Sequence, residues 1–206
     1  FNFAVASRML IGLAICLLLL LIKQQKLSIS KIAISNYIYA GLGVFVTMSL
    51  VYYSSQSIPS GIISVVFGLT PIITGVFALL LLKDPFFKFH KIAGLLLGIT
   101  GLFTIFGHTL NVATEMISGL LAVTFAMAFQ SFISVKLKQI SAPISALETT
   151  TGALIISVPL FIISWLLTEG SVPTITLKAA LSIGYLAVFG SVIGFMSYYY
   201  LIRHAS

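Results

Sequence analysis

Long apolar runs separated by short polar breaks cover this sequence from one end to the other. A helix needs about 20 consecutive apolar residues to cross the hydrocarbon core of a bilayer. The runs have this length, and they read as continuous Leu, Ile, Val and Phe rather than as the alternating pattern of a membrane β-barrel. We therefore expect an all-α integral membrane protein, a multi-span helical bundle. Its seven predicted spans are residues 3–22, 34–54, 59–82, 90–107, 114–135, 143–167 and 178–201.

The composition excludes the soluble classes of protein. Hydrophobic residues make up 59% of the 206 residues and charged residues 7%, whereas a soluble domain carries about 25% charged residues. So few charges cannot solvate a globular surface, which rules out a soluble enzyme, a nucleic-acid-binding protein and a disordered protein. The net charge of +7 is scattered between apolar runs and makes no patch for nucleic acid. The single cysteine, Cys16, rules out a disulfide framework within the chain.

The basic residues are distributed unequally between the two sides of the predicted spans. Lys178 is the one positive charge in the loops of one side, and Arg8 lies inside the first span. The nine on the other side are Lys23, Lys26, Lys31, Lys83, Lys88, Lys91, Lys136, Lys138 and Arg203. Because Lys and Arg are enriched in cytoplasmic loops, we expect a multi-pass protein of the plasma membrane with its N-terminus outside and its C-terminus in the cytoplasm.

The two halves of the sequence contain a weak internal repeat. At an offset of 140 residues Gly12 aligns with Gly152, and further glycine and paired tyrosine matches follow at an offset of 147 residues. The repeat predicts a first unit, residues 1–107, that lacks its first helix, and a second unit, residues 108–206, that lacks its last two. Completing both gives about 280 residues with five spans in each unit, so we interpret the sequence as a fragment. An odd number of spans inserts the second unit upside down relative to the first, as in many transporters.

Four stretches resemble EamA-like members of the drug/metabolite transporter superfamily. ASRMLIGLAICLLLLLI is similar to the second helix of that family, SIPSGIISVVFGLTPIITGVFALLLLKD to the fourth, HKIAGLLLGITGLFTIFG to the fifth and YLAVFGSVIGFMSYYYLIRHAS to the eighth. The pair Lys83-Asp84 departs from the Gly-Glu that usually follows the fourth helix. The resemblance implies two inverted five-helix units and export of a small metabolite, amino acid or drug-like solute by alternating access about a central cavity.

Two charged residues occupy equivalent positions in the repeat. Arg8 and Glu148 both lie inside predicted spans, where a charge is expensive enough to suggest a task. In inverted units they lie near opposite faces, so we expect no direct salt bridge. Arg8 is a candidate for attracting an anionic group at the outer mouth of a cavity, and Glu148 lies at the inner mouth. The alternative is that each side chain reaches to its nearby interface.

Proton coupling would need a titratable group within the membrane. Glu148 is the only acid well inside a predicted span, so it is the candidate carrier if protons are the coupling ion. No group of His, Cys, Asp or Glu has the spacing of metal ligands, and we expect neither a metal nor a cofactor. The expected partners are a small-molecule substrate and the lipid bilayer, with no nucleic acid.

Polar and aromatic residues in the spans are candidates for the cavity wall. Pro71 removes a backbone hydrogen bond in the middle of its span and frees a carbonyl, which is tolerated where it lines a cavity or finds a neighbouring donor. The candidates for substrate binding, besides Arg8 and Glu148, are Thr47, Tyr52, Gln56, Thr70, Pro71, Gln130, Tyr198 and Tyr199. Such a wall is polar but mostly uncharged and suits an amphipathic, zwitterionic or aromatic solute. The alternative for the tyrosines is an interfacial anchor.

Two other classes of function compete with transport. Seven helices with the N-terminus outside is also the topology of a membrane receptor, but no cysteine pair or NPxxY-like sequence is present, and a receptor leaves the repeat unexplained. An intramembrane enzyme would need a catalytic arrangement, yet Asp84 is the only aspartate and lies in a loop, and no HExxH motif occurs. We therefore expect a protein that is not an enzyme, with a receptor as the alternative to a transporter.

Overall fold

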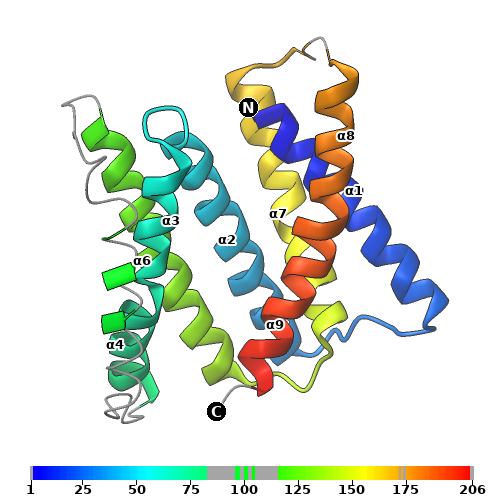
Figure 1. The fold of residues 1–206 in the computed structure, drawn as a ribbon. Coiled ribbons are helices and arrows are strands. Elements are labelled where there is room, and N and C mark those ends of the chain that lie inside the picture. Colours follow the sequence, from blue (N-terminus) through cyan, green and yellow to red (C-terminus); the bar gives the residue numbers. More distant parts are fainter. Residues whose placement is uncertain are drawn as a thin grey trace. The chain divides into compact units, whose positions relative to one another are not determined.

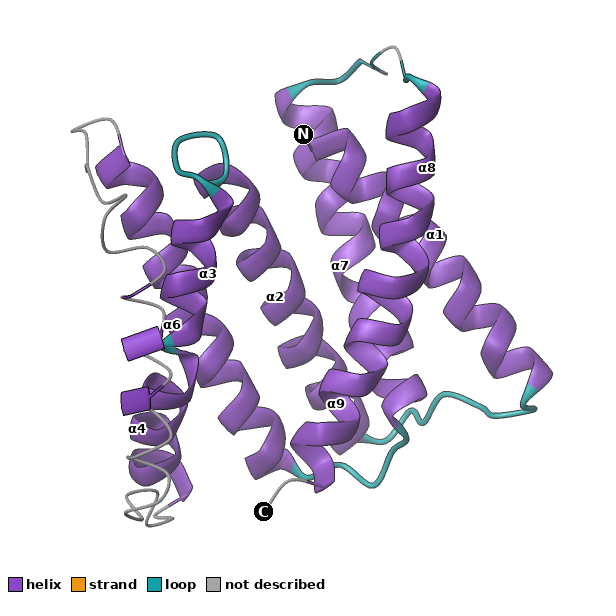
Figure 2. Cartoon of the chain, in the orientation of Figure 1, coloured by secondary structure: helices purple, strands orange, loops and turns teal. Residues whose placement is uncertain are grey.

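The computed structural model describes residues 2–82, 96–97, 100–101, 104, 116–171, 173 and 175–204. All regular structure within these residues is helical, and none of them forms a strand (Figure 2). Six helical segments of the described residues are long and apolar enough to cross a membrane. They coincide with six of the seven predicted spans, and the remaining one, residues 90–107, falls largely outside the described residues. The all-helical membrane class is thus confirmed.

Nine helical elements have defined bounds within the described residues (Figure 1). Two spans are composite, because Leu69 interrupts the third and a π-helical segment lies within the last. The elements are α1 (Asn2–Ile22), α2 (Lys31–Ser54), α3 (Ser60–Gly68), α4 (Thr70–Leu82), α6 (Ile117–Ile140), α7 (Ala146–Thr168), α8 (Leu177–Tyr185), η3 (Leu186–Ile193) and α9 (Gly194–His204).

Packing divides the chain into two compact units. The first comprises Phe1–Phe45 with Ile140–Ser206, and the second comprises Val46–Gln139. These bounds differ from the predicted repeat units, residues 1–107 and 108–206. The compact units are defined by contacts in space, whereas the repeat units are defined by similarity between two parts of the sequence. The repeat boundaries therefore stay a prediction.

In the first unit, α1 and α7 lie side by side and run in opposite directions (Figure 1). At the start of α1, the Asn2 side-chain amide donates to the hydroxyl of Thr168 at the end of α7, at 2.6 Å. Near the middle of both helices, Gly12 faces Leu154, whose Cδ1 would lie 3.8 Å from a Cβ at the glycine. The two helices are therefore an antiparallel pair.

The first half of α2 packs on α7 in the same unit. The ring of Tyr37 covers Gly152, and the rings of Phe45 and Phe161 meet edge to face with centroids 5.0 Å apart. Residue numbers rise together along the two helices, so α2 runs parallel to α7. Between these contacts Gly41 sits so close to α7 that a Cβ there would lie 2.8 Å from the Ala153 carbonyl oxygen.

The last span packs on α1 through η3. Ser191 is fully buried, and its Cβ would lie 3.2 Å from a Cβ at Gly12. Its hydroxyl contacts the Met9 sulfur at 3.7 Å. The helix that follows α1 in the chain thus packs on α7. The span that follows α7 packs on α1 through α8 and η3 and on α7 through α9.

In the second unit, α6 packs along the end of α2 and along α3. The Ser54 hydroxyl donates to the carbonyl of Gly119 at 2.8 Å, which joins the C-terminus of α2 to the first turn of α6. Further apolar contacts come from α3 and the loop before it. The buried core residues are Ile58, Val66, Val123 and Met127.

Candidate functional site

Arg8 lies in the second turn of α1 with only 8% of its surface exposed. It is the only charged residue of that helix. A cation covered to this extent within a span is expensive, and such residues usually have a functional partner. Within the described unit its burial favours the functional interpretation over a side chain that reaches into the interface. Its role in binding stays a prediction.

Glu148 caps the start of α7. The Ser145 backbone N–H donates to Glu148 Oε2 at 2.7 Å, and the Glu148 backbone N–H donates to the Ser145 hydroxyl at 3.1 Å. This reciprocal capping box satisfies two backbone donors that the first turn of a helix otherwise leaves open. The structure therefore corrects one expectation: Glu148 lies in the first turn of its span, not well inside it. The Ser-x-x-Glu spacing is the sequence signal of this cap.

Arg8 and Glu148 lie far apart along the pair of helices α1 and α7. Because α1 and α7 are antiparallel, Arg8 near the start of α1 and Glu148 at the start of α7 lie toward opposite ends of the helix pair. This separation along the helix pair agrees with the expectation that the two residues form no direct salt bridge.

The second unit brings two of the predicted site residues together. Thr47, with 2% of its surface exposed, donates its hydroxyl hydrogen to Gln130 Oε1 at 3.0 Å. The neighbouring Ser131 is fully buried, and its hydroxyl has no hydrogen-bond partner among the described residues. A buried polar group without a partner is costly, especially where no water is available. The predicted residues Thr47 and Gln130 therefore bond across the packed helices α2 and α6.

The carbonyl that loses its helical donor at the break around Leu69 finds a donor in a neighbouring residue. Pro71 has no N–H, so the carbonyl of Phe67, four residues earlier, loses its usual helical donor. The Thr70 hydroxyl donates to that same carbonyl, and the Leu69 N–H turns back to Val66 in a tighter bond of 3.0 Å. The freed carbonyl is therefore occupied by the adjacent threonine. A break within a span is tolerated where the freed carbonyl lines a cavity or finds a neighbouring donor, and here it finds a neighbouring donor.

The remaining predicted residues lie in different surroundings. Tyr52 is partly buried in the last turn of α2, whereas Gln56 is exposed in the turn that follows that helix. On α9 of the first unit, Tyr199 is buried with 6% of its surface exposed, and the neighbouring Tyr198 ring meets it edge to face at 5.2 Å. Tyr199 therefore packs inside its unit rather than serving as an exposed interfacial anchor.

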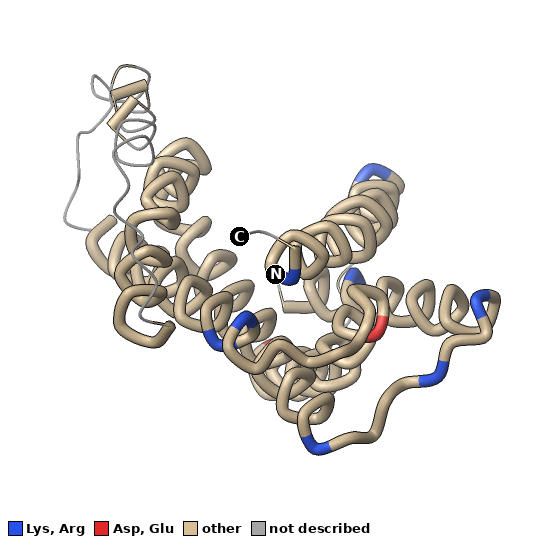
Figure 3. Tube along the Cα trace, turned by 90° about the horizontal axis from the view of Figure 1, so that it is seen from below, with Lys and Arg blue, Asp and Glu red and all other residues tan. Residues whose placement is uncertain are grey.

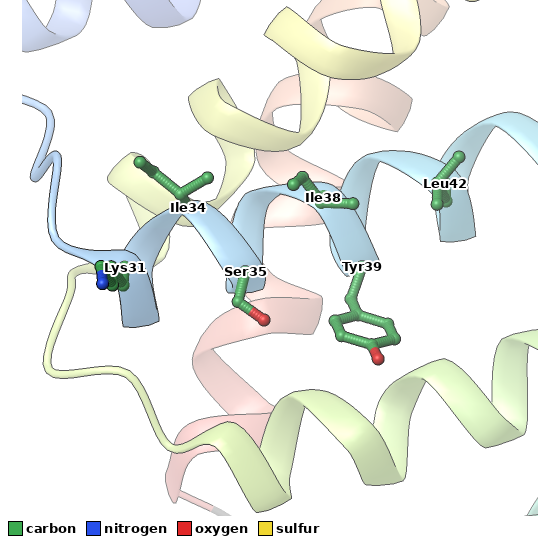
Figure 4. A pocket seen from close by; sticks show the side chains of 6 residues that line it. All are labelled: Lys31, Ile34, Ser35, Ile38, Tyr39 and Leu42. Carbon is green, nitrogen blue, oxygen red and sulfur yellow. The ribbon is translucent and has the colours of Figure 1, made fainter.

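One open groove of about 510 Å³ lies along α2 and contains none of the predicted residues (Figure 4). Figure 4 shows the hydroxyl groups of Ser35 and Tyr39 on the same side of the helix. An amine, two hydroxyls and three aliphatic side chains suit an amphipathic molecule that offers an acceptor or an anionic group. The lining residues are Lys31, Ile34, Ser35, Ile38, Tyr39 and Leu42. These residues are spaced three or four positions apart, which marks one face of a helix, and this spacing is the sequence signal that could have found them.

Comparison with known families now identifies the kind of protein. Residues 1–107 match the model of the EamA-like transporter family. The chain belongs to this family. The resemblance inferred from the four sequence stretches is thus confirmed, and with it membership in a family of membrane transporters.

Individual relatives share moderate similarity with the chain. The uncharacterized inner membrane transporter YedA of Escherichia coli (strain K12) is 29% identical over 153 residues, which are 73% of this chain and 48% of the relative. An uncharacterized transporter of Buchnera aphidicola subsp. Schizaphis graminum is 24% identical over 162 residues, 78% of this chain and 54% of the relative. The chain therefore spans about half the length of these relatives.

A solved crystal structure has a similar fold. It superposes on 98% of this chain and 69% of its own with a TM-score of 0.81 and 18% sequence identity. This likeness supports the helical architecture and says nothing of substrate.

Proposed function

We propose that this protein exports a small metabolite, amino acid or drug-like solute by alternating access about a central cavity. The observation that carries the proposal is the exchange of packing partners in the first unit. The helices α1 and α7 are antiparallel. The helix that follows α1 packs on α7, and the span that follows α7 packs on α1 through α8 and η3 and returns to α7 through α9. This is the packing expected of two five-helix units related by inversion, an architecture of secondary transporters. A receptor, the alternative considered from the sequence, gives no reason for such a relation.

We also propose that the protein lies in the inner membrane with the N-terminus outside. The name of the E. coli relative gives that membrane. In the first unit, the connection from α1 to α2 carries basic residues at the end where α7 begins (Figure 3). Arg203 joins this end, because its Nη1 donates to the Ile144 carbonyl just before α7, at 2.6 Å. Lys178 lies at the opposite end, at the start of α8, so the positive-inside rule favours this orientation.

Each unit offers its own recognition chemistry in this proposal. Arg8 supplies a buried cation for an anionic group of the solute, and the Thr47–Gln130 pair supplies neutral hydrogen-bonding groups. One cation with neutral polar groups suits a zwitterionic or aromatic solute better than a polyanion. Tyr52, Gln56, Thr70, Pro71, Tyr198 and Tyr199 stay in the proposed cavity wall, with Thr70 and Pro71 weakened as candidates by the bond to Phe67.

Protons stay the candidate coupling ion, with Glu148 as carrier. Its carboxylate accepts the Ser145 N–H, and a hydrogen bond to an ionised acceptor is stronger than one to a neutral group. The capping box thus ties this side chain to the start of α7.

An efflux assay tests the proposed function. Cells that overproduce the protein are loaded with labelled amino acids, aromatic metabolites and cationic dyes, and the rate of loss is compared with that of cells without it. We expect faster efflux of at least one solute, and a loss of about tenfold in Arg8→Gln, since a hydrogen bond to a charged group is worth about that factor. Lys178→Gln is the matched control, because it removes an exposed cation in the same unit. Unchanged efflux of every solute, with the protein present in the membrane, would reject the proposal.

A further inference from the structure

The last span contains a π-helical segment of eight residues, η3, between α8 and α9. In a π-helix each N–H bonds to the carbonyl five residues earlier, and such segments are rare, short and frequent at functional sites. Here the Gly194 N–H bonds to the carbonyl of Phe189, five residues earlier, at the end of the segment. The span of 28 residues, Leu177–His204, therefore consists of two α-helical arms joined by a wider π-helical segment.

The two arms are buried to different extents within the first unit. The first arm, α8, packs on α1, but none of its residues is buried in the part of the chain that the structure describes. By contrast, Ala187 and Ser191 of η3 are fully buried against α1, and Arg203 of α9 bonds to the carbonyl of Ile144. The π segment thus begins where an arm without buried residues meets a buried segment.

Glycine lowers the resistance of this boundary to bending. Gly190 is exposed in the middle of η3, and a Cβ there would meet only the Leu186 Cδ2 atom, at an ordinary 3.7 Å. No tight packing therefore requires glycine at this position, and what the residue adds is backbone freedom. Gly184 in α8 offers the matched comparison, because a Cβ there would have no described atom within 4 Å.

We propose that η3 is a hinge about which α8 swings while α9 stays on the first unit. Exchange of a five-residue bond for a four-residue bond passes the extra residue along the helix and turns each residue that it passes by about 100° about the helix axis. The wider segment also bends more readily than an α-helix, because its hydrogen bonds are less well formed. Its role as a gate rests on the proposed transport function, because α8 lies at the end of the unit that the positive-inside rule places outside. The hinge itself is a property of the chain with or without solute.

Spin-label distances test the hinge in the protein reconstituted in lipid nanodiscs, with Cys16 replaced by alanine. One labelled pair, Leu181 on α8 and Leu167 on α7, reports on the first arm; a second pair, Leu201 on α9 and Ile155 on α7, reports on the second arm. All four side chains are exposed. We expect the distance distribution of the first pair to be at least about twice as broad as that of the second, or to show two populations.

Two glycine variants then locate the flexibility. Gly190→Ala narrows the Leu181–Leu167 distribution at least about twofold if η3 is the hinge, whereas Gly184→Ala leaves it unchanged. Equal widths for the two pairs, no effect of Gly190→Ala, or equal narrowing by both variants would each overturn the proposal. Because the distances are measured without solute, a failure of the efflux assay leaves this result standing, and a failure here leaves the efflux result standing.

Discussion

Hydroxyl groups inside the spans bond mostly to carbonyls of their own helix. Thr150 and Thr151, both fully buried, donate to the carbonyls of Ala146 and Leu147 at 2.8 Å. Ser157, equally buried on the same helix, has no hydrogen-bond partner among the residues described. A buried hydroxyl that bonds to a carbonyl of its own helix costs little free energy in a bilayer. A buried hydroxyl without a partner is a place where a solute or a buried water would be stabilised.

Glu148→Gln separates the structural role of this residue from a role in proton coupling. Glutamine at the same position also forms a capping box with serine, so we expect the thermal midpoint in detergent to stay close to that of the wild type. Ser145→Ala removes the cap and should cost about 1 kcal/mol of stability. If Glu148 carries the proton, Glu148→Gln abolishes efflux driven by a pH gradient while its stability is retained.

Two results would contradict this division of roles. Full pH-driven efflux by Glu148→Gln would remove the residue as proton carrier. A fall in thermal midpoint as large as that of Ser145→Ala would show that the negative charge, not the side-chain acceptor, holds the start of α7.

At the scale of elements, the crossing of α2 and α7 brings Gly41 against the backbone of α7. A Cβ at Gly41 would lie 2.5 Å from Ile156 Cβ and 2.8 Å from the Ala153 carbonyl oxygen. The second of these is backbone and cannot rotate away, so Gly41→Ala has to separate the two helices. We expect a loss of about 1–3 kcal/mol, the usual cost of overpacking. Thermal unfolding in detergent measures it, with Gly184→Ala as the control that adds a methyl group in open space. An unchanged midpoint for Gly41→Ala would show that the helices do not approach this closely.

The elements themselves were largely predictable from length and hydropathy. Six predicted spans coincide with helices because a continuous apolar run of about 20 residues has no other stable arrangement in a membrane. The prediction for α2 began at residue 34, three residues late, because Lys31 was taken as part of the break. The helix instead begins at Lys31, with the Ser30 hydroxyl accepting from the Ala33 N–H at 3.2 Å.

Other features had no comparable signal in the sequence. The π segment is as apolar as the helices on either side, so its wider bonding pattern cannot be read from residue type. Thr47 and Gln130 were both candidates, but their pairing across 83 positions depends on how α2 and α6 pack. The prediction for Glu148 rested on its apolar neighbours in the sequence. In the structure its surroundings are set by the cap that it forms with Ser145.

At the scale of the whole molecule, the proposed inversion and the proposed orientation are linked. The α1–α2 connection and the start of α7 lie at one end of the first unit, and the α7–α8 connection lies at the other. Basic residues cluster at the first end, where Lys23 and Lys26 lie in the connection. If that end faces the cytoplasm, the equivalent helices α1 and α7 must enter the membrane from opposite sides, as inverted units require.

Single cysteines test this orientation directly. In a chain with Cys16 replaced by alanine, Lys26→Cys probes the α1–α2 connection and Ser171→Cys probes the α7–α8 connection; both positions are exposed. We expect a membrane-impermeant maleimide to label Ser171→Cys in intact cells, and Lys26→Cys only after the cells are permeabilised. The reverse pattern would contradict the positive-inside assignment and leave the inversion intact, because the two sites would still lie on opposite sides. Labelling of both sites in intact cells would contradict the inversion as well, since the ends of α1 and α7 would then lie on the same side of the membrane.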